Sequence, residues 1–250
     1  MDQAKSIADV ISKLDDIINW SKLQQHRAGY FAVLYRRMTI AVQQGIINGS
    51  FENAERMAQL DVNFANRYFE AWQAYSDKQP CTSAWTKVFD TCNAKSLIIL
   101  QHLLLGINTH INLDLAIAAA KTSPGKTIFD LQNDFDKINV VIAAVMQTIQ
   151  GNLVKIWPPL KLVLAISNKE QDAVLNFSIT NARKISWANA TILANLEEQA
   201  FNTYIDSIDG AVVEVAERII NPGLMTALLL KPVLLMESEN ISDNIDKLNE

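Results

Sequence analysis

The stretch that most constrains the fold runs from Ser96 to Ala120, SLIILQHLLLGINTHINLDLAIAAA. It is apolar around nearly its whole circumference, which is typical of a helix buried on all sides. The stretch nevertheless carries polar side chains that a core usually excludes: Gln101, His102, Asn108, His110, Asn112 and Asp114. A polar group buried without a partner costs about 1–3 kcal/mol, and an unpaired charge costs more. We therefore predict a central helix whose polar groups are partnered by other segments.

The polar residues of this helix fall on two opposite faces, because steps of four residues drift only about 40° around a helix. One face, at four-residue spacing, holds His102, Gly106, His110 and Asp114. The other face holds Gln101, Asn108 and Asn112. A glycine inside a helix costs about 1 kcal/mol relative to alanine. We therefore expect Gly106 to make room for a neighbouring backbone, a water or a ligand.

The rest of the chain is also typical of helices. Glycine (8) and proline (6) are scarce in 250 residues, and 49% hydrophobic with 20% charged residues is a globular composition. We found no strand-like alternation, internal repeat or Gly/Ser/Pro-rich linker. The prediction is an all-α fold, a single-domain multi-helix bundle over residues 1–250 around a buried central helix at about 96–120. The core spans about 28–220, and 221–250 are expected to form a C-terminal apolar segment and a frayed tail.

Composition and charge favour a cytoplasmic protein that does not bind nucleic acid, and the buried polar groups of the central helix favour a pocket for a small molecule. A net charge of −5, a pI of about 5.3 and the lack of a Lys/Arg cluster argue against nucleic acid. The N-terminus lacks a signal-peptide pattern, and the polar residues of the central helix argue against a membrane span. Cys81 and Cys92 lack metal-type spacing and are expected to be reduced thiols. The apolar segment at 224–236 leaves a homo-oligomer as a further expectation.

Several strings resemble one known family. HLLLGINTHINLDL at 102–115 resembles the signature of an uncharacterised bacterial and fungal family, domain-of-unknown-function family 5995. The strings YRRMT, LDVNFANRYFEA, SAWTKVF, NDFDKIN and NARKISWANA are similar to it as well, so the resemblance covers about residues 30–195. Where the family tends to read NAH, this chain has Asn108-Thr109-His110. The resemblance implies an all-helical fold and an important central helix, and it supplies no activity.

His110 and Asp114 carry the sharpest chemical signal. An imidazole and a carboxylate one helical turn apart can chelate one metal ion. His102 is expected on the same side of this helix, and Asp61 and Asp134 beside the core-facing stripes of two other predicted helices. The spacing predicts a mixed site for a divalent metal (Zn, Mn or Fe), completed by water. The candidate ligands are His102, His110, Asp114, Asp134 and Asp61.

On this prediction the protein is an enzyme that hydrolyses a small molecule in a central polar pocket, because a metal lowers the pKa of bound water. Arg183 or Arg67 would bind an anionic part of the substrate, and the two asparagines would orient it. The catalytic candidates are His110, Asp114, Asn108, Asn112 and Arg183. Two alternatives stay open: a hydrogen-bonded network that only fixes helix register, and a metal-free acid–base pair or ligand clamp. The protein would then be a binding module or a structural protein.

Overall fold

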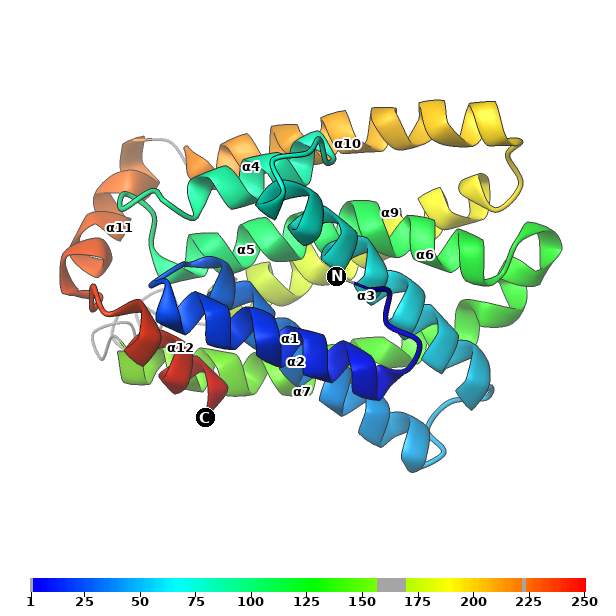
Figure 1. The fold of residues 1–250 in the computed structure, drawn as a ribbon, viewed down its shortest axis with the longest axis horizontal. Helices are drawn as coiled ribbons and strands as arrows, with labels where there is room; N and C mark the ends of the chain where they lie inside the picture. Colours follow the sequence, from blue (N-terminus) through cyan, green and yellow to red (C-terminus); the bar gives the residue numbers. More distant parts are fainter. Residues whose placement is uncertain (1, 157–169, 222–223) are drawn as a thin grey trace.

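The computed structural model describes residues 2–156, 170–221 and 224–250, and within these ranges it contains helices and no strand (Figure 1). The predicted all-α fold is therefore confirmed. The α-helices are α1 (Ile7–Leu23), α2 (Ala28–Ile47), α3 (Ala54–Ser76), α4 (Ser83–Thr91), α5 (Ile99–Thr109), α6 (Leu115–Thr122), α7 (Gln132–Ile156), α9 (Glu170–Leu193), α10 (Glu198–Ile220), α11 (Leu224–Met236) and α12 (Ile241–Asn249). A π-helical turn, η1 (His110–Asp114), joins α5 to α6, and a 3₁₀ segment, η2 (Gly125–Leu131), precedes α7.

The predicted central helix is the α5–η1–α6 unit. Figure 1 shows it running through the middle of the bundle, between α4 and α10 on one side and α1, α2 and α7 on the other. Helix α9 packs along α6. By length and composition alone, Ile99–Thr122 could cross a membrane, but 78% of that window is buried inside the structure. Burial by neighbouring helices explains its apolar composition, as expected for the core helix of a bundle.

Local sequence signals set several helix starts. The Ser6 side chain accepts a hydrogen bond from the Asp9 amide, and the Asp9 carboxylate accepts one from the Ser6 amide, which forms a capping box for α1. Asn53 caps α3 through the Arg56 amide at 2.9 Å. Asn240 caps α12 in the same way. These caps satisfy amide donors that a helix leaves free at its first turn.

The C-terminal residues are ordered by packing, contrary to the frayed tail expected from their polar composition. Helix α12 packs against α1, α2 and α7, with Ile245 fully buried. Its polar side is tied to the bundle by the Lys22–Asp246 ion pair and by Arg37, which donates to the Leu248 carbonyl at 2.9 Å. The apolar positions of this short helix are spaced for one buried face, a signal hidden by its overall polarity.

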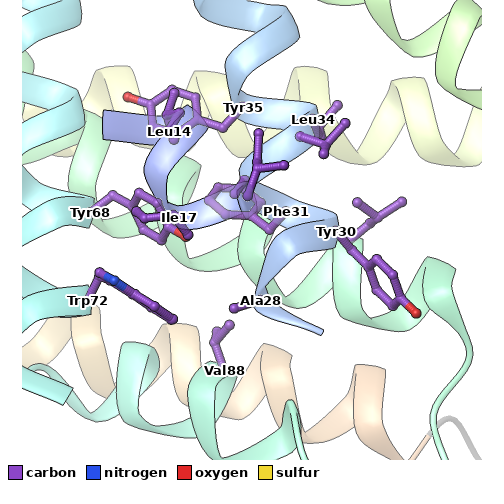
Figure 2. Packing of buried hydrophobic residues seen from close by; sticks show 14 of the residues in the cluster. Leu14, Ile17, Ala28, Tyr30, Phe31, Leu34, Tyr35, Tyr68, Trp72 and Val88 are labelled. Carbon is purple, nitrogen blue, oxygen red and sulfur yellow. The ribbon is translucent and has the colours of Figure 1, made fainter. Parts of the chain in front are cut away.

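Aromatic side chains of α2, α3 and α4 fill the centre of the bundle around the α5–η1–α6 unit. Figure 2 shows Tyr30, Phe31, Tyr35, Tyr68 and Trp72 within one buried cluster. A Cβ atom at Gly106 would lie 2.4 Å from the Phe31 ring. The space that Gly106 leaves is therefore taken by an aromatic side chain rather than by the backbone, water or ligand that we expected.

Candidate functional site

The two residues with the sharpest sequence signal, His110 and Asp114, are the first and last residues of the π turn η1. The Leu115 amide donates to the His110 carbonyl, which is the i→i+5 bond of a π-helix. Single π turns inside α-helices occur often at functional sites. The wider turn interrupts the 3.6-residue repeat, so the polar stripe predicted from His102 to Asp114 does not continue unbroken through the helix.

Asp114 is fully buried and accepts hydrogen bonds from three other residues. Trp85 Nε1 donates to Oδ2 at 2.8 Å, Arg67 Nε donates to Oδ1 at 3.3 Å, and His110 Nδ1 lies 3.1 Å from Oδ2. The Trp85 and Arg67 groups can only donate, so the carboxylate acts as the acceptor. His110 Nδ1 therefore carries the hydrogen of its bond to Asp114, and the other ring nitrogen, Nε2, is left with a lone pair.

The His110 ring is held between aromatic side chains. It stacks on Phe64 with centroids 3.6 Å apart and an interplanar angle of 10°, and the Tyr35 ring centroid lies 4.4 Å away. Burial lowers the pKa of His110, against the raising effect of Asp114, so the imidazole is neutral near pH 7. The carboxylate and the stack together fix both the tautomer and the plane of this base.

A cavity of about 90 Å³ adjoins η1, lined by side chains of α2, α3, α5, α6, α7 and α9 as well as His110 and Ile111. Its lining is mostly aliphatic and aromatic. Three lining residues have a buried polar atom with no hydrogen-bond partner among the described residues: Tyr35 Oη, Asp61 Oδ2 and His110 Nε2. We call these three atoms the cavity trio. They come from α2, α3 and η1, which are distant in sequence and meet at this point.

The protonation states of the cavity trio follow from its burial. Desolvation raises the pKa of Asp61 from 3.8 to about 7. Burial, with smaller effects of Asp61 and Asp114, raises the pKa of Tyr35 well above its ordinary value. Near neutral pH the trio therefore comprises a phenol donor, a carboxyl group that is partly protonated, and an imidazole acceptor.

The structure does not bring the five predicted metal ligands together. Asp134 accepts from the amides of Glu52 and Asn53 at 2.7 and 3.0 Å and pairs with Arg56, so it fixes the segment that leads into α3. These bonds outweigh its burial and lower the pKa of Asp134. Among the residues described, no group of three or more His, Cys, Asp or Glu side chains could hold a metal ion.

His102 also lies away from the cavity. Its ring packs edge-on to Tyr30 with centroids 6.1 Å apart, and it lines a separate small pocket near Arg27. Burial lowers the pKa of His102 to about 3, so this imidazole is neutral throughout the physiological range. Only His110 and Asp61, of the five, line the cavity.

The predicted catalytic asparagines form hydrogen bonds on the opposite side of the central helix, towards α10. Asn108 Nδ2 donates to the Val212 carbonyl of α10 at 3.0 Å, and Asn112 Nδ2 donates to Asn108 Oδ1 at 3.0 Å. Gln101 Nε2 donates to the Ile219 carbonyl of the same helix at 2.8 Å. This amide face therefore fixes α5 and η1 against α10 and does not reach the cavity.

Arg183 lines the cavity and is almost fully buried. Its Nε donates to Asn139 Oδ1 at 2.7 Å, a second guanidinium nitrogen donates to the Phe135 carbonyl, and the group lies 4.3 Å from the Phe135 ring centroid. Burial lowers the pKa of Arg183 to about 10, so the cation persists at neutral pH. Arg183 joins α9 to α7 and places a positive charge beside the cavity.

Sequence reasoning missed three residues of this site. Tyr35 and Phe64 flank His110, and Trp85, expected to be core, is an Asp114 donor. Each of them lies in a string that resembles the family signature: YRRMT, LDVNFANRYFEA or SAWTKVF. Those strings were the available signal, since they join residues that the fold brings to one point.

A family model described as "Family of unknown function (DUF5995)" matches residues 7–222. The chain belongs to this family. The DUF5995 match includes Asp114, its three donors and the cavity trio, and it ends before α11 and α12. Comparison with curated proteins and comparison with solved structures gave no match.

Proposed function

We propose that this DUF5995 protein binds a small, largely apolar molecule in the cavity beside η1. The observation that carries the proposal is the cavity trio: three buried polar atoms without a described partner, whose residues come from three separate elements and all line one otherwise apolar cavity. Binding sites for small molecules are mostly apolar with a few convergent polar groups, and this arrangement has that character. The trio would bind the one polar group of the ligand.

The energetic cost of the trio supports this proposal. Each buried polar atom without a partner costs about 1–3 kcal/mol, and such atoms are rare in native proteins. A hydroxyl or carbonyl group on a ligand would supply the missing partners. The tautomer of His110 leaves Nε2 as an acceptor, whereas Tyr35 offers a donor. The trio therefore suits a ligand whose oxygen accepts a hydrogen bond from Tyr35 and which has a hydrogen within reach of His110 Nε2.

The cavity limits the size of the ligand. Its volume of about 90 Å³ is smaller than the roughly 150 Å³ of an engineered apolar cavity that admits benzene. Benzene has six non-hydrogen atoms, so a molecule of about four is the expected scale. We therefore take propan-2-ol and acetone as probes, because each combines a compact apolar body with one oxygen.

The binding test compares two buried tyrosines, Tyr35 and Tyr68, whose hydroxyls both have no partner among the described residues. Tyr35 lines the cavity and Tyr68 does not. We expect propan-2-ol to bind the wild type in a saturation-transfer NMR titration. Tyr35→Phe should weaken binding about 2–10-fold, the value of one hydrogen bond, and Tyr68→Phe should leave it unchanged. Failure of both probes to bind, or equal losses in the two variants, would refute the proposal.

Metal-assisted hydrolysis, the activity predicted from the sequence, is the second candidate. It is supported by His110 and Asp61, which both line the cavity, but Asp114 already accepts from three donors. Elemental analysis of tag-free protein tests it, beside His110→Ala and Asp114→Ala. About one Zn, Mn or Fe per chain, lost in both variants while the helical circular dichroism persists, would support a metal site.

A further inference from the structure

We propose that the cavity is the active site of an acid–base enzyme that moves a proton on a small apolar ketone or aldehyde. His110 is the base for a proton on the carbon next to the carbonyl group. Tyr35 and Asp61 donate hydrogen bonds to the carbonyl oxygen. The inference rests on the proposed function, because the same cavity must first bind the substrate.

The base is built as an oriented imidazole. The Asp114 carboxylate, itself held by Trp85 and Arg67, accepts from His110 Nδ1 and so keeps the lone pair on Nε2. A buried carboxylate on the far nitrogen holds a catalytic histidine in its useful tautomer and stabilises the imidazolium that forms when it takes a proton. Stacking on Phe64 fixes the plane of the ring. Asp114 is therefore a positioning residue, and His110 is the residue that would touch substrate.

The acid side of the site is formed by Tyr35 and Asp61. Both side chains are buried on the same apolar lining, and Tyr35 also packs against the base with ring centroids 4.4 Å apart. An apolar site that keeps a carboxylic acid neutral allows it to donate a hydrogen bond to a developing oxyanion. Such donors stabilise charge that appears only in the transition state, which is where binding energy accelerates a reaction.

The lining favours proton transfer over acyl transfer. Among the described residues that line the cavity, none is Ser, Thr or Cys, so no hydroxyl or thiol nucleophile of those types is placed there. The rest of the lining is mostly aliphatic and aromatic, and such low-polarity surroundings strengthen the electrostatic interactions of the base. A base and two oxyanion donors in a mostly apolar cavity are the groups that enolisation needs.

The step balances without any other reactant. The Nε2 lone pair of His110 takes the proton, and the electron pair of the broken C–H bond forms a carbon–carbon double bond. The carbonyl π pair moves onto oxygen, which accepts hydrogen bonds from Tyr35 and Asp61. Return of the proton to the same carbon regenerates the ketone. Its delivery two carbons further along a β,γ-unsaturated ketone gives the conjugated isomer, with no oxidant or reductant consumed.

The test is hydrogen–deuterium exchange of acetone in D₂O, followed by ¹H NMR with the full-length protein. General base catalysis contributes about 10²–10⁴-fold, so we expect exchange in the wild type at least 100-fold faster than with His110→Gln. Tyr35→Phe and Asp61→Asn should each lower the rate 10-fold or more. His102→Gln and Tyr68→Phe are matched controls, since both residues are buried and lie off the cavity lining, and they should exchange within twofold of wild type.

A pH profile separates this role from a structural one. The groups around the cavity are Tyr35 of α2, Asp61 of α3, His110 of η1 and Arg183 of α9, with Asp114 and Arg67 behind His110. Because burial raises the pKa of Asp61 to about 7, the enzymatic rate should fall above that pH as the donor ionises. Exchange driven by hydroxide rises with pH instead. If one variant lost exchange only because it failed to fold, the fall of the wild-type rate above pH 7 and the losses in the other two variants would still need the acid–base groups.

Saturation transfer on the same samples distinguishes the two proposals. If acetone binds and its protons exchange only at the rate seen in buffer, the acid–base inference is overturned while the binding function stands. If neither acetone nor propan-2-ol binds and no exchange occurs, both proposals fail. Exchange that persists in His110→Gln would also overturn the inference, because the base would then be another group.

Discussion

The two polar faces of the α5–η1–α6 unit are both largely buried, with Asn112 half-buried, and yet they differ in hydrogen-bond pairing. On the amide face, the side-chain nitrogen and oxygen atoms of Gln101 and Asn108 are all partnered, through the α10 backbone, the Ile98 amide and Asn112. On the other face, Asp114 accepts from three donors, whereas His110 Nε2 has no partner among the described residues, and neither have the two other atoms of the cavity trio, on α2 and α3. Burial of polar groups alone therefore does not distinguish the two faces. Unpaired polar atoms on three residues that line one cavity do, because native proteins pair most of their buried polar groups.

Asp114→Ala is expected to lower the free energy of unfolding more than the other changes considered, and it tests how far the two faces differ. The change leaves the Trp85 and His110 ring N–H groups and the Arg67 cation without their acceptor, and breaking a buried charge pair costs about 3–5 kcal/mol. Asn108→Ala on the amide face removes neutral bonds and should cost about 1–3 kcal/mol. Urea unfolding monitored by circular dichroism measures both. Equal losses would show that the Asp114 network is no more demanding than the amide face.

The pH dependence of stability should show the free-energy cost of ionising the buried Asp61 side chain. Its folded-state pKa is raised from 3.8 to about 7, so between these values the folded protein retains a proton that the unfolded chain loses. The stability contributed by this group is full below about pH 4 and falls by about 1 kcal/mol per pH unit up to about pH 7. Asp61→Asn should flatten that window when the free energy of unfolding is measured at pH 4.5 and pH 7.5. Parallel profiles for wild type and variant would contradict this.

Sequence patterns predicted the all-α fold and the two polar faces because both depend on local periodicity. The spacing of Gln101, Asn108 and Asn112 was enough to place them opposite His110. The π turn was not predictable, since its residues have ordinary helical spacing and its wider bond pattern depends on packing. The role of Asp134 could not be read either, because it depends on where the chain brings the start of α3, about 80 residues away.

The smallest predicted change in stability, that of Tyr35→Phe, decides whether the Tyr35 hydroxyl of the cavity trio has a structural role. Tyr35→Phe removes a hydroxyl that has no partner among the described residues, so it should leave stability unchanged or raise it by up to about 1 kcal/mol. Tyr30→Phe removes a hydroxyl that accepts from Asn244 at 3.3 Å and should cost about 0.5–1.5 kcal/mol. Thermal and urea unfolding of the two variants provide the comparison. If Tyr35→Phe destabilises as much as Tyr30→Phe, the Tyr35 hydroxyl is a structural group, and the cavity trio loses the donor on which ligand recognition depends. If it does not, the protein carries this hydroxyl at no benefit to its own stability, and the partner that explains it comes from outside the chain.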